Sequence, residues 1–363
     1  DLVRSRGLGD VYKRQGKYPY IVAEIGGNHN GDIELGKKMI KAAKECGADA
    51  VKFQLYRRED LWTEDHLKEL NDGVVKLENV SNWSTKELGL NNIFEQVDKF
   101  AVQEQEHIEF FNYARELGID YGTSAFTKKD VDFCIDQKCA NLKVASCDVT
   151  NLDLIEYVIS KDYPTQIALG MASLAEIEAV VKLIPERFKH NVTLLHCVSL
   201  YPPKDEYVNL NFLHTLRQAF GMEVGYSDHT FGFSIPLAAI ALGATVIEKH
   251  FTLDKNLPGW DHKVSANPEE MRIIASESKR IVDALGNGIK VVSDDEIAKQ
   301  KKFRRSITTA DSLKAGQEIT YNDILFKRPG TGIPADRFKE VIGRHVNRDI
   351  EENKTLFWED LVK

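Results

Sequence analysis

Two histidines stand at the ends of successive strand-like runs in the second half of the chain. His229 follows Gly-Tyr-Ser-Asp, and His250 follows Glu-Lys, 21 residues later. Between them, residues 232–243 have apolar side chains near helical spacing and a proline in the first turn. A strand–helix–strand unit with a right-handed crossover makes the strands parallel neighbours, so both imidazoles emerge at the same end of one sheet. Two neutral imidazoles that converge there could hold a divalent metal.

A carboxylate follows within reach of this pair. Asp261 lies in the motif Gly-Trp-Asp-His at 259–262, where it could orient a metal ligand or bind substrate. A single buried histidine is more often a hydrogen-bonded core residue than a ligand. The repetition of histidine one βα unit apart, with Asp261 nearby, is what favours a functional site over that alternative.

Other polar residues stand near the carboxyl ends of strand-like runs that are otherwise apolar. Parallel strands covered on both faces make a buried charge costly unless it is paired or binds something. Lys52 and Lys143 would make the pocket cationic, which suits a small substrate with a carboxylate and a phosphate; the alternative is ion pairing with Glu24 or Asp148. Glu24 could act as a general base or orient a water, with a structural hydrogen bond as the alternative. The rest of this set is Gln54, Ser124, Ser146, His196, Ser227 and Glu248.

Eight strand-like runs, each followed by an amphipathic helical pattern, must position these residues. Eight such units favour an α/β fold of the closed (β/α)₈ TIM barrel type over an open doubly wound sheet, and no Gly-rich dinucleotide fingerprint is present. Catalytic groups of such barrels gather at the carboxyl ends of the strands. The predicted strands are 20–25, 50–55, 120–125, 141–146, 165–170, 192–198, 223–229 and 245–251, and clear helices are predicted at 34–46, 102–117, 232–243 and 268–285.

The pattern predicts four segments along the chain. Residues 1–16 form a disordered or extraneous extension, 17–287 the barrel, 288–304 a charged linker, and 305–363 a small β-rich domain. Within the barrel, the polar connection 57–100 precedes the helix predicted at 102–117. A connection of that length is either an active-site loop or subunit contact, or a solvated surface insertion.

Composition excludes several classes of partner. The net charge of −8 over 363 residues argues against nucleic acid, whose binders carry a basic face. No apolar run is long enough to span a bilayer, so no membrane insertion is expected. The five cysteines are scattered without metal-ligand spacing, which is typical of a protein in a reducing cytoplasm.

In combination, these motifs resemble the sialic acid, or nonulosonic acid, synthases of the N-acetylneuraminate synthase type. The resemblance runs from about residue 18 to the C-terminus, where the tail is similar to the small SAF (antifreeze-like) domain of these enzymes. The motifs that carry it are Ala23-Glu-Ile-Gly26, Val51-Lys-Phe-Gln54, Leu142-Lys-Val-Ala-Ser146, Leu195-His-Cys197, Tyr201-Pro202, Ser227-Asp-His-Thr230, Lys249-His-Phe-Thr252 and Pro258-Gly-Trp-Asp261.

The resemblance implies a condensation of phosphoenolpyruvate with an N-acylmannosamine-type sugar and water, which forms a nine-carbon α-keto acid and phosphate. It also implies a divalent metal at His229 and His250, Mn²⁺ with Mg²⁺ or Co²⁺ as substitutes, that polarises the sugar aldehyde. Glu24 and Asp148 would stabilise positive charge at the former phosphoenolpyruvate C2, while Lys52 and Lys143 hold the phosphate. The implied substrate contacts are Ser124, Ser146 and Ser227 for phosphoenolpyruvate, and Gln54, Tyr201 and Asp261 for the sugar.

In the C-terminal segment, Arg328 matches an arginine that related enzymes extend into the partner subunit's barrel, which implies a domain-swapped homodimer. The alternative is an ordinary surface arginine beside a Pro-Gly turn. The sequence departs from many relatives at Ala168, Ser199 and Asp148, where they carry serine, asparagine and glutamate. The sugar therefore stays open among N-acetylmannosamine, its 6-phosphate and 2,4-diacetamido-6-deoxy sugars.

Two other functions fit parts of the pattern. An aldolase on the same barrel could use Lys52 or Lys143 as a Schiff base. A non-catalytic, sugar-binding relative is compatible with the departures at Ala168 and Ser199.

Overall fold

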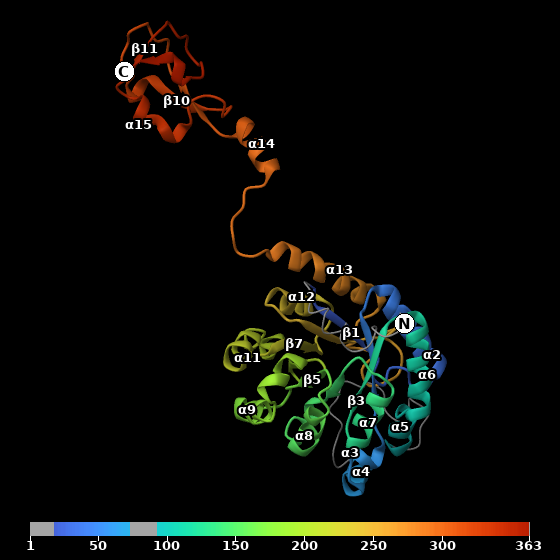
Figure 1. Ribbon diagram of the computed structural model, residues 1–363. Coiled ribbons are helices and arrows are strands. Elements are labelled where there is room, and N and C mark those ends of the chain that lie inside the picture. Colours follow the sequence, from blue (N-terminus) through green and yellow to red (C-terminus); the bar gives the residue numbers. More distant parts are fainter. Residues whose placement is uncertain (1–17, 73–92, 363) are drawn as a thin grey trace, which may run out of the picture. The chain divides into compact units, whose positions relative to one another are not determined.

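Eight parallel strands close into a barrel in the first of the two units of this chain (Figure 1). The computed structural model describes residues 18–72 and 93–362, and its two compact units are Asp1–Gly286 and Asn287–Lys363. The extension predicted at 1–16 and part of the long connection, 73–92, lie outside the described residues.

Each strand of the barrel pairs in parallel with the next, and β1 pairs with β8, which closes the sheet. The predicted TIM barrel is therefore confirmed. Most differences are at the carboxyl ends, where β4, β5 and β7 stop before the predicted Ser146, Gly170 and His229, so these residues lie in the loops that follow. The strands are β1 Tyr20–Glu24, β2 Ala50–Leu55, β3 Asp120–Ala125, β4 Leu142–Val144, β5 Thr165–Ala168, β6 Val192–Cys197, β7 Glu223–Asp228 and β8 Val246–His250.

Helices follow the strands and surround the barrel (Figure 1). Their ends carry local stop signals: the Asp32 side chain accepts from the backbone N–H groups of Glu34 and Leu35 at the start of α2, and Gly47 ends it with φ +89°. The main helices are α2 Ile33–Cys46, α6 Glu104–Leu117, α7 Lys128–Asp136, α8 Leu152–Ser160, α9 Leu174–Lys182, α11 Phe212–Phe220, α12 Ser234–Ala241 and α13 Pro268–Leu285. Shorter turns are η1 Ser146–Asp148, η2 Glu186–Asn191 and α10 Asp205–Val208.

The long connection after β2 contains helices that the polar sequence did not predict. They are α3 Arg58–Leu61, α4 Glu64–Asn71 and α5 Ile93–Phe100. In α5, Ile93, Val97 and Phe100 have helical spacing, and Val97 and Ala101 are buried against Tyr56, so this packing stabilises the helix. The next helix, α6, begins at Glu104 rather than 102, since the Glu106 carboxylate accepts from the Gln103 backbone N–H and caps it there.

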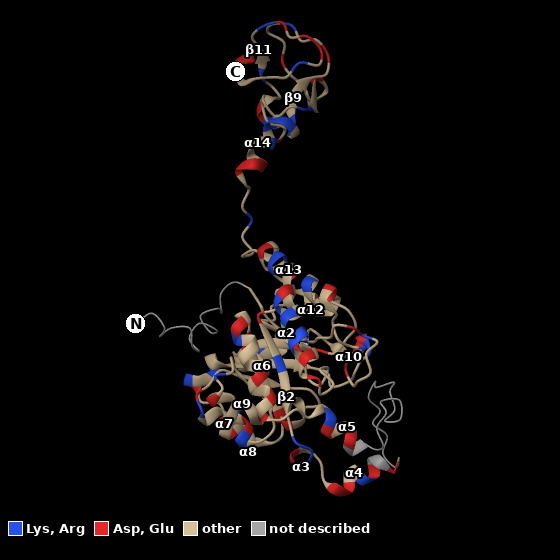
Figure 2. Ribbon diagram, turned by 90° about the vertical axis from the view of Figure 1, so that its right-hand side faces the viewer, with Lys and Arg blue, Asp and Glu red and all other residues tan. Residues whose placement is uncertain are grey.

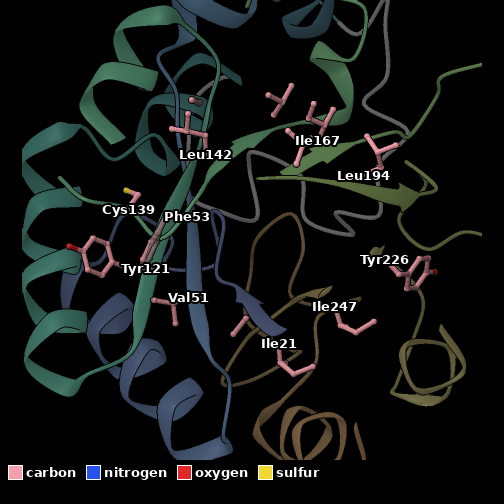
Figure 3. Packing of buried hydrophobic residues seen from close by; sticks show 14 of the residues in the cluster. Ile21, Val51, Phe53, Tyr121, Cys139, Leu142, Ile167, Leu194, Tyr226 and Ile247 are labelled. Atoms are coloured by element: carbon pink, nitrogen blue, oxygen red, sulfur yellow. The ribbon is translucent and has the colours of Figure 1, made fainter. Parts of the chain in front are cut away.

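The main core lies between the outer face of the strands and the helices (Figure 3). Phe53 of β2 stacks on Phe110 of α6 with ring centroids 4.6 Å apart, and Phe111 stacks on Tyr121 of β3 at 4.7 Å. Alternate residues of each strand therefore serve this core, which leaves the other half of each strand to fill the barrel.

The second unit has its own apolar core and two antiparallel strand pairs. β9 Ser306–Thr309 pairs with β10 Ile324–Lys327, and β11 His345–Val346 pairs with β12 Leu361–Val362. The segment predicted as a charged linker holds the helix α14 Asp294–Phe303, whose first turn is capped by Ser293. A short helix, α15 Phe338–Val341, completes this small β domain.

The surface of both units is charged. Figure 2 shows basic and acidic segments intermixed on the outer helices. Within 18–72 and 93–362, no helix is long and apolar enough to span a membrane.

A buried histidine couples this fold to pH. His107 of α6 is fully buried; its Nδ1 lies 3.0 Å from the Gln103 carbonyl oxygen, and its ring contacts Phe53, Phe110 and Phe111. Burial lowers the pKa of His107 to about 4. The folded state therefore holds a neutral imidazole that an unfolded chain would protonate below its ordinary pKa of 6.5.

We predict that His107→Gln reduces the acid sensitivity of folding. The neutral ring contributes fully to the free energy of unfolding above pH ~6.5, and this contribution is lost as the pH falls towards 4. Between pH 7.5 and 4.5 the variant should lose about 2 to 3 kcal/mol less free energy of unfolding than the wild type, measured with urea. The exposed His214→Gln is the control and should follow the wild type. Identical losses in His107→Gln and wild type would contradict the assignment.

Candidate active site at the barrel mouth

The inside of the barrel has two layers of different chemistry. Towards the amino ends of the strands it is closed by the apolar side chains of Val22, Ala50, Leu195 and Val246. A Cβ at Gly225 would lie 2.6 Å from the Leu195 side chain, so this layer is tightly packed. Charged and hydroxyl side chains lie above it, at the carboxyl ends of the strands, which we call the barrel mouth.

Two lysines and two glutamates form a buried ionic cluster at the barrel mouth. Lys52 Nζ lies 2.5 Å from Glu24 Oε2 and 3.8 Å from Glu248 Oε2. Lys143 Nζ donates to Glu248 Oε1 at 2.7 Å. All four side chains are at most 7 % exposed. The ion pairing that the sequence left open is therefore present, with Glu24 as one partner and Glu248, rather than Asp148, as the other.

The two carboxyls of this cluster differ in their electrostatics. Burial raises the pKa of Glu24 to about 7, against the opposing effect of Lys52. Burial acts in the same direction on Glu248, but Lys143 and Lys52 outweigh it and lower the pKa of Glu248 to about 2. Glu248 is thus a fixed anion, whereas Glu24 can exchange a proton near neutral pH.

The predicted hydroxyl and amide residues surround this cluster. Lys52 donates to Ser124 Oγ at 3.1 Å, and Ser227 Oγ donates to Glu248 at 3.0 Å. Gln54 Nε2 donates to Glu24 Oε1 at 3.1 Å. Ser146 begins the turn η1 and accepts from the Gly170 backbone N–H at 3.1 Å. Three strands, β2, β3 and β7, and the loop after β4 therefore bring these side chains to one region.

The two histidines meet at the same end of the barrel. Their ring centroids are 5.4 Å apart. His229 Nδ1 lies 2.9 Å from the Val198 carbonyl oxygen. In the neutral ring Nδ1 is therefore the donor to this oxygen, and Nε2 keeps a lone pair. His250 Nδ1 is buried and has no hydrogen-bond partner among the described residues. Burial has the largest effect on the pKa of His250, and the charge of His229 acts in the same direction. Together they hold this pKa well below its ordinary value, which favours a neutral ring.

Tyr201 and Asp261 complete this side of the site. The Tyr201 ring lies over His229, with centroids 3.9 Å apart, and 5.8 Å from His250. Asp261 Oδ2 is 3.7 Å from His250 Nδ1, and its side chain is 20 % exposed. The predicted grouping of Asp261 with the histidine pair is thus seen in the structure.

These residues suit an open cation site. Within 18–72 and 93–362, no group of three or more His, Cys, Asp and Glu side chains is arranged to hold a metal ion. A buried, unpartnered ring nitrogen at His250 and a fixed tautomer at His229 nevertheless fit two ligands to one divalent ion, with the remaining positions left to substrate and water.

Two predicted residues have other contacts. Asp148, in η1, accepts from Asn151 Nδ2 at 3.1 Å. Arg328 belongs to the second unit, where it is exposed; its Nε donates to the Phe303 carbonyl oxygen at 3.1 Å, and its guanidinium lies 5.2 Å from the centre of the Phe303 ring.

Comparison with known families shows to which family this chain belongs. A model described as NeuB family matches residues 39–290, and a SAF domain model matches residues 304–362. This chain belongs to the NeuB family. NeuB proteins are nonulosonic acid synthases that condense phosphoenolpyruvate and generally depend on a metal.

Relatives match this NeuB chain over nearly its full length. It is 36 % identical to N,N'-diacetyllegionaminic acid synthase of Legionella pneumophila, over 94 % of each chain. It is 31 % identical to human N-acetylneuraminate-9-phosphate synthase, over 96 % of this chain and 94 % of the other. The crystal structure of the N-acetylneuraminic acid synthetase of Leptospira borgpetersenii in complex with citrate has a TM-score of 0.66 and 31 % identity, and covers 78 % of this chain and 91 % of that one.

Glu248 is among the polar residues predicted at strand ends, but its ion pair with Lys143 was not predicted. The signal was available, since Glu248 lies two residues before His250 and therefore on the same inward face of β8. The sequence could not identify Lys143 as the partner of Glu248, because the two residues are 105 positions apart in the chain.

A second buried ion pair lies on the outer face of β7 and β8, and each of its residues immediately precedes one of the two histidines. Lys249 Nζ lies 2.6 Å from Asp228 Oδ2, and both side chains are 0 % exposed. Asp228 Oδ1 also accepts from the Tyr226 hydroxyl at 2.9 Å and from the Thr230 backbone N–H at 3.0 Å. Asp228 and Lys249 are register partners of β7 and β8, so their pair fixes the residues that immediately precede His229 and His250.

We predict that Lys249→Met lowers the free energy of unfolding by about 3 to 5 kcal/mol, because it leaves the Asp228 charge buried without a counter-ion. Urea denaturation measures this. Asp228→Asn combined with Lys249→Met should recover part of the loss. Lys182→Met is the matched control, as its pair with Glu178 is exposed, and should cost less than about 1 kcal/mol. A similar small loss for Lys249→Met would show that the buried pair does not hold the strands.

Proposed function

We propose that this protein condenses phosphoenolpyruvate with an N-acylmannosamine-type sugar and water, in a metal-dependent reaction that yields a nonulosonic acid and phosphate. The observation that carries the proposal is the position of Lys52 and Lys143 beside the pair His229 and His250 in one barrel mouth. Cations suited to an anionic substrate and imidazoles suited to a metal thus lie at the same end of the barrel.

The anionic substrate belongs on the lysine side. Each ammonium has three donors, so Lys52 and Lys143 can hold oxygens of phosphoenolpyruvate in addition to their present partners. The hydroxyls of Ser124, Ser146 and Ser227 lie at the same strand ends and add further contacts. Charge-assisted hydrogen bonds of this kind are strong in a buried site.

Glu24 is the proposed proton-exchanging group. Its pKa of about 7 matches a carboxyl that takes a proton from water and returns it near neutral pH. Glu248 is a fixed anion that orients Lys143. We propose that Glu24, together with Asp148 in the loop after β4, stabilises positive charge that develops at phosphoenolpyruvate C2.

The sugar belongs on the histidine side. His229 and His250 would hold the metal, Mn²⁺ with Mg²⁺ or Co²⁺ as substitutes, which when bound supplies Lewis-acid polarisation of the sugar aldehyde. Val198 fixes the His229 tautomer and Tyr201 covers its ring. Gln54, Tyr201 and Asp261 are the proposed sugar contacts.

We also propose a homodimer in which Arg328 of a second copy reaches the barrel mouth. Exposed apolar side chains follow three adjacent strands: Met171 (71 % exposed), Leu200 (49 %) and Phe231 (53 %). Such a patch at the rim of a functional site is typical of a surface that another protein covers.

The Schiff-base aldolase is disfavoured by the charges of the lysines. A Schiff base requires a neutral amine. Burial would lower the pKa of Lys52, but Glu24 and Glu248 raise it above its ordinary value. Lys143 likewise donates to Glu248 at 2.7 Å. Borohydride with a carbonyl substrate should therefore trap no adduct.

We predict phosphate release from phosphoenolpyruvate only when Mn²⁺ and a suitable sugar are both present. The panel contains N-acetylmannosamine, its 6-phosphate and 2,4-diacetamido-2,4,6-trideoxy sugars. His229→Ala and His250→Ala should each lower kcat/KM at least a thousandfold while the circular dichroism spectrum is retained; His214→Ala, exposed on α11, is the control. Release by either variant at the wild-type rate would remove the metal assignment. Sugar binding without any release would favour the non-catalytic reading.

A further inference from the structure

Tyr56 carries a buried hydroxyl that the fold does not use. The residue follows β2 directly, its side chain is 3 % exposed, and its hydroxyl has no hydrogen-bond partner among the described residues. A buried donor without a partner destabilises the folded protein. Phenylalanine would fill the same space without that cost, so the hydroxyl calls for an explanation outside folding.

Aromatic side chains from three loops surround Tyr56. Its ring meets Trp62 edge-on at 6.1 Å and Phe126 at 6.3 Å with an interplanar angle of 90°. Trp260 belongs to the same cluster and immediately precedes Asp261. The cluster therefore joins the connection after β2 to the loop after β8 on one side of the barrel mouth, since β1 pairs with both strands.

The direction of Tyr56 follows from its strand. Lys52 and Gln54 point into the barrel, where both contact Glu24, and the two-residue period places Tyr56 on the same face, one step further out. Burial, together with the charges of Asp261 and Asp98, raises the pKa of the Tyr56 hydroxyl. Since Trp260 of the same aromatic cluster immediately precedes Asp261, Tyr56 lies on the side of the mouth proposed for the sugar.

We propose that Tyr56 is a specificity-determining residue of the sugar site. Its hydroxyl donates a hydrogen bond to an uncharged acceptor on the sugar, either a hydroxyl or the carbonyl oxygen of an N-acyl group. The surrounding aromatic rings pack on the apolar part of the same substituent, such as an acyl methyl. This inference rests on the proposed function.

The charges around Tyr56 indicate that this substituent is not phosphorylated. Arg57 is engaged by Asp60 at 2.8 Å, by Glu104 at 2.9 Å and by Asp130 at 3.2 Å. Arg58 is likewise paired with a carboxylate, Asp98, at 3.0 Å. The two cations next to Tyr56 are thus already neutralised, and Asp261 would repel a phosphate dianion.

The test is Tyr56→Phe, compared with Tyr163→Phe. With a non-phosphorylated N-acyl sugar, Tyr56→Phe should raise KM for the sugar about threefold to tenfold and leave KM for phosphoenolpyruvate unchanged. Its thermal midpoint should equal or exceed that of the wild type, because no hydrogen bond within the protein is lost. Tyr163→Phe removes a buried hydroxyl that donates to the Cys139 carbonyl oxygen at 2.6 Å, before β5 and thus away from the mouth. It should lower the midpoint and change neither KM.

A set of sugar analogues, each lacking one hydroxyl or N-acyl group, locates the contact. For the analogue that lacks the contacted group, wild type and Tyr56→Phe should have the same KM. A 6-phosphorylated sugar should have at least a tenfold higher KM than its non-phosphorylated form, and preference for the phosphate would overturn the inferred substrate class.

An unchanged sugar KM in Tyr56→Phe, or equal rises in both KM values, would overturn the role of Tyr56. A wild type that releases no phosphate with any sugar would instead contradict the proposed function. In that case, calorimetric titration of the same sugars into wild type and Tyr56→Phe still decides the role of the hydroxyl, which requires weaker binding by the variant.

Discussion

The buried charges inside the barrel are the constraint on which the rest of this structure depends. Lys52, Lys143, Glu24 and Glu248 are withdrawn from water, and each would be prohibitively costly alone. They are tolerated because four different strands deliver them at one level, where two cations meet two anions. An apolar layer seals the barrel beneath them, so this cluster opens only towards the mouth. Despite burial, Glu24 and Glu248 keep Lys52 charged, and we propose that the ion pairs hold both lysines in position for an anionic substrate.

The outer and inner faces of β7 and β8 have different roles. On β7 and β8, the outer residues Asp228 and Lys249 form a fully buried pair, while the adjacent inward residues include His229 and His250. The rigid outer pair sets the register, and the inner residues retain unused capacity, such as the unpartnered Nδ1 of His250. Stability and chemistry are thus carried by neighbouring residues on opposite faces, and the unpartnered hydroxyl of Tyr56 extends this pattern to the rim of the mouth.

The strand pattern and the site residues on it could be predicted from the sequence because alternation and polar strand ends are local signals. Three features could not. The bond between Lys143 and Glu248 depends on barrel closure, which brings β4 and β8 to face each other across the interior. The packing of helix α5 depends on burial of Val97 and Ala101 against Tyr56. Its apolar residues Ile93, Val97 and Phe100 have helical spacing, but that spacing does not identify the contact. In the sequence, nothing distinguishes Tyr56 from any other aromatic residue after a strand. Only its three-dimensional surroundings show that its hydroxyl lacks a hydrogen-bond partner among the described residues.

The central claim is that the paired lysines form the binding site of the anionic substrate. The most direct measurement is calorimetric titration of phosphoenolpyruvate into the protein without sugar. The Lys143→Met, Glu248→Gln double variant removes one ion pair without leaving a buried charge, and the account predicts that it binds phosphoenolpyruvate at least tenfold more weakly than the wild type does. Lys182→Met, which alters an exposed ion pair, should bind as the wild type does. Equal affinity of the double variant and the wild type would contradict the account.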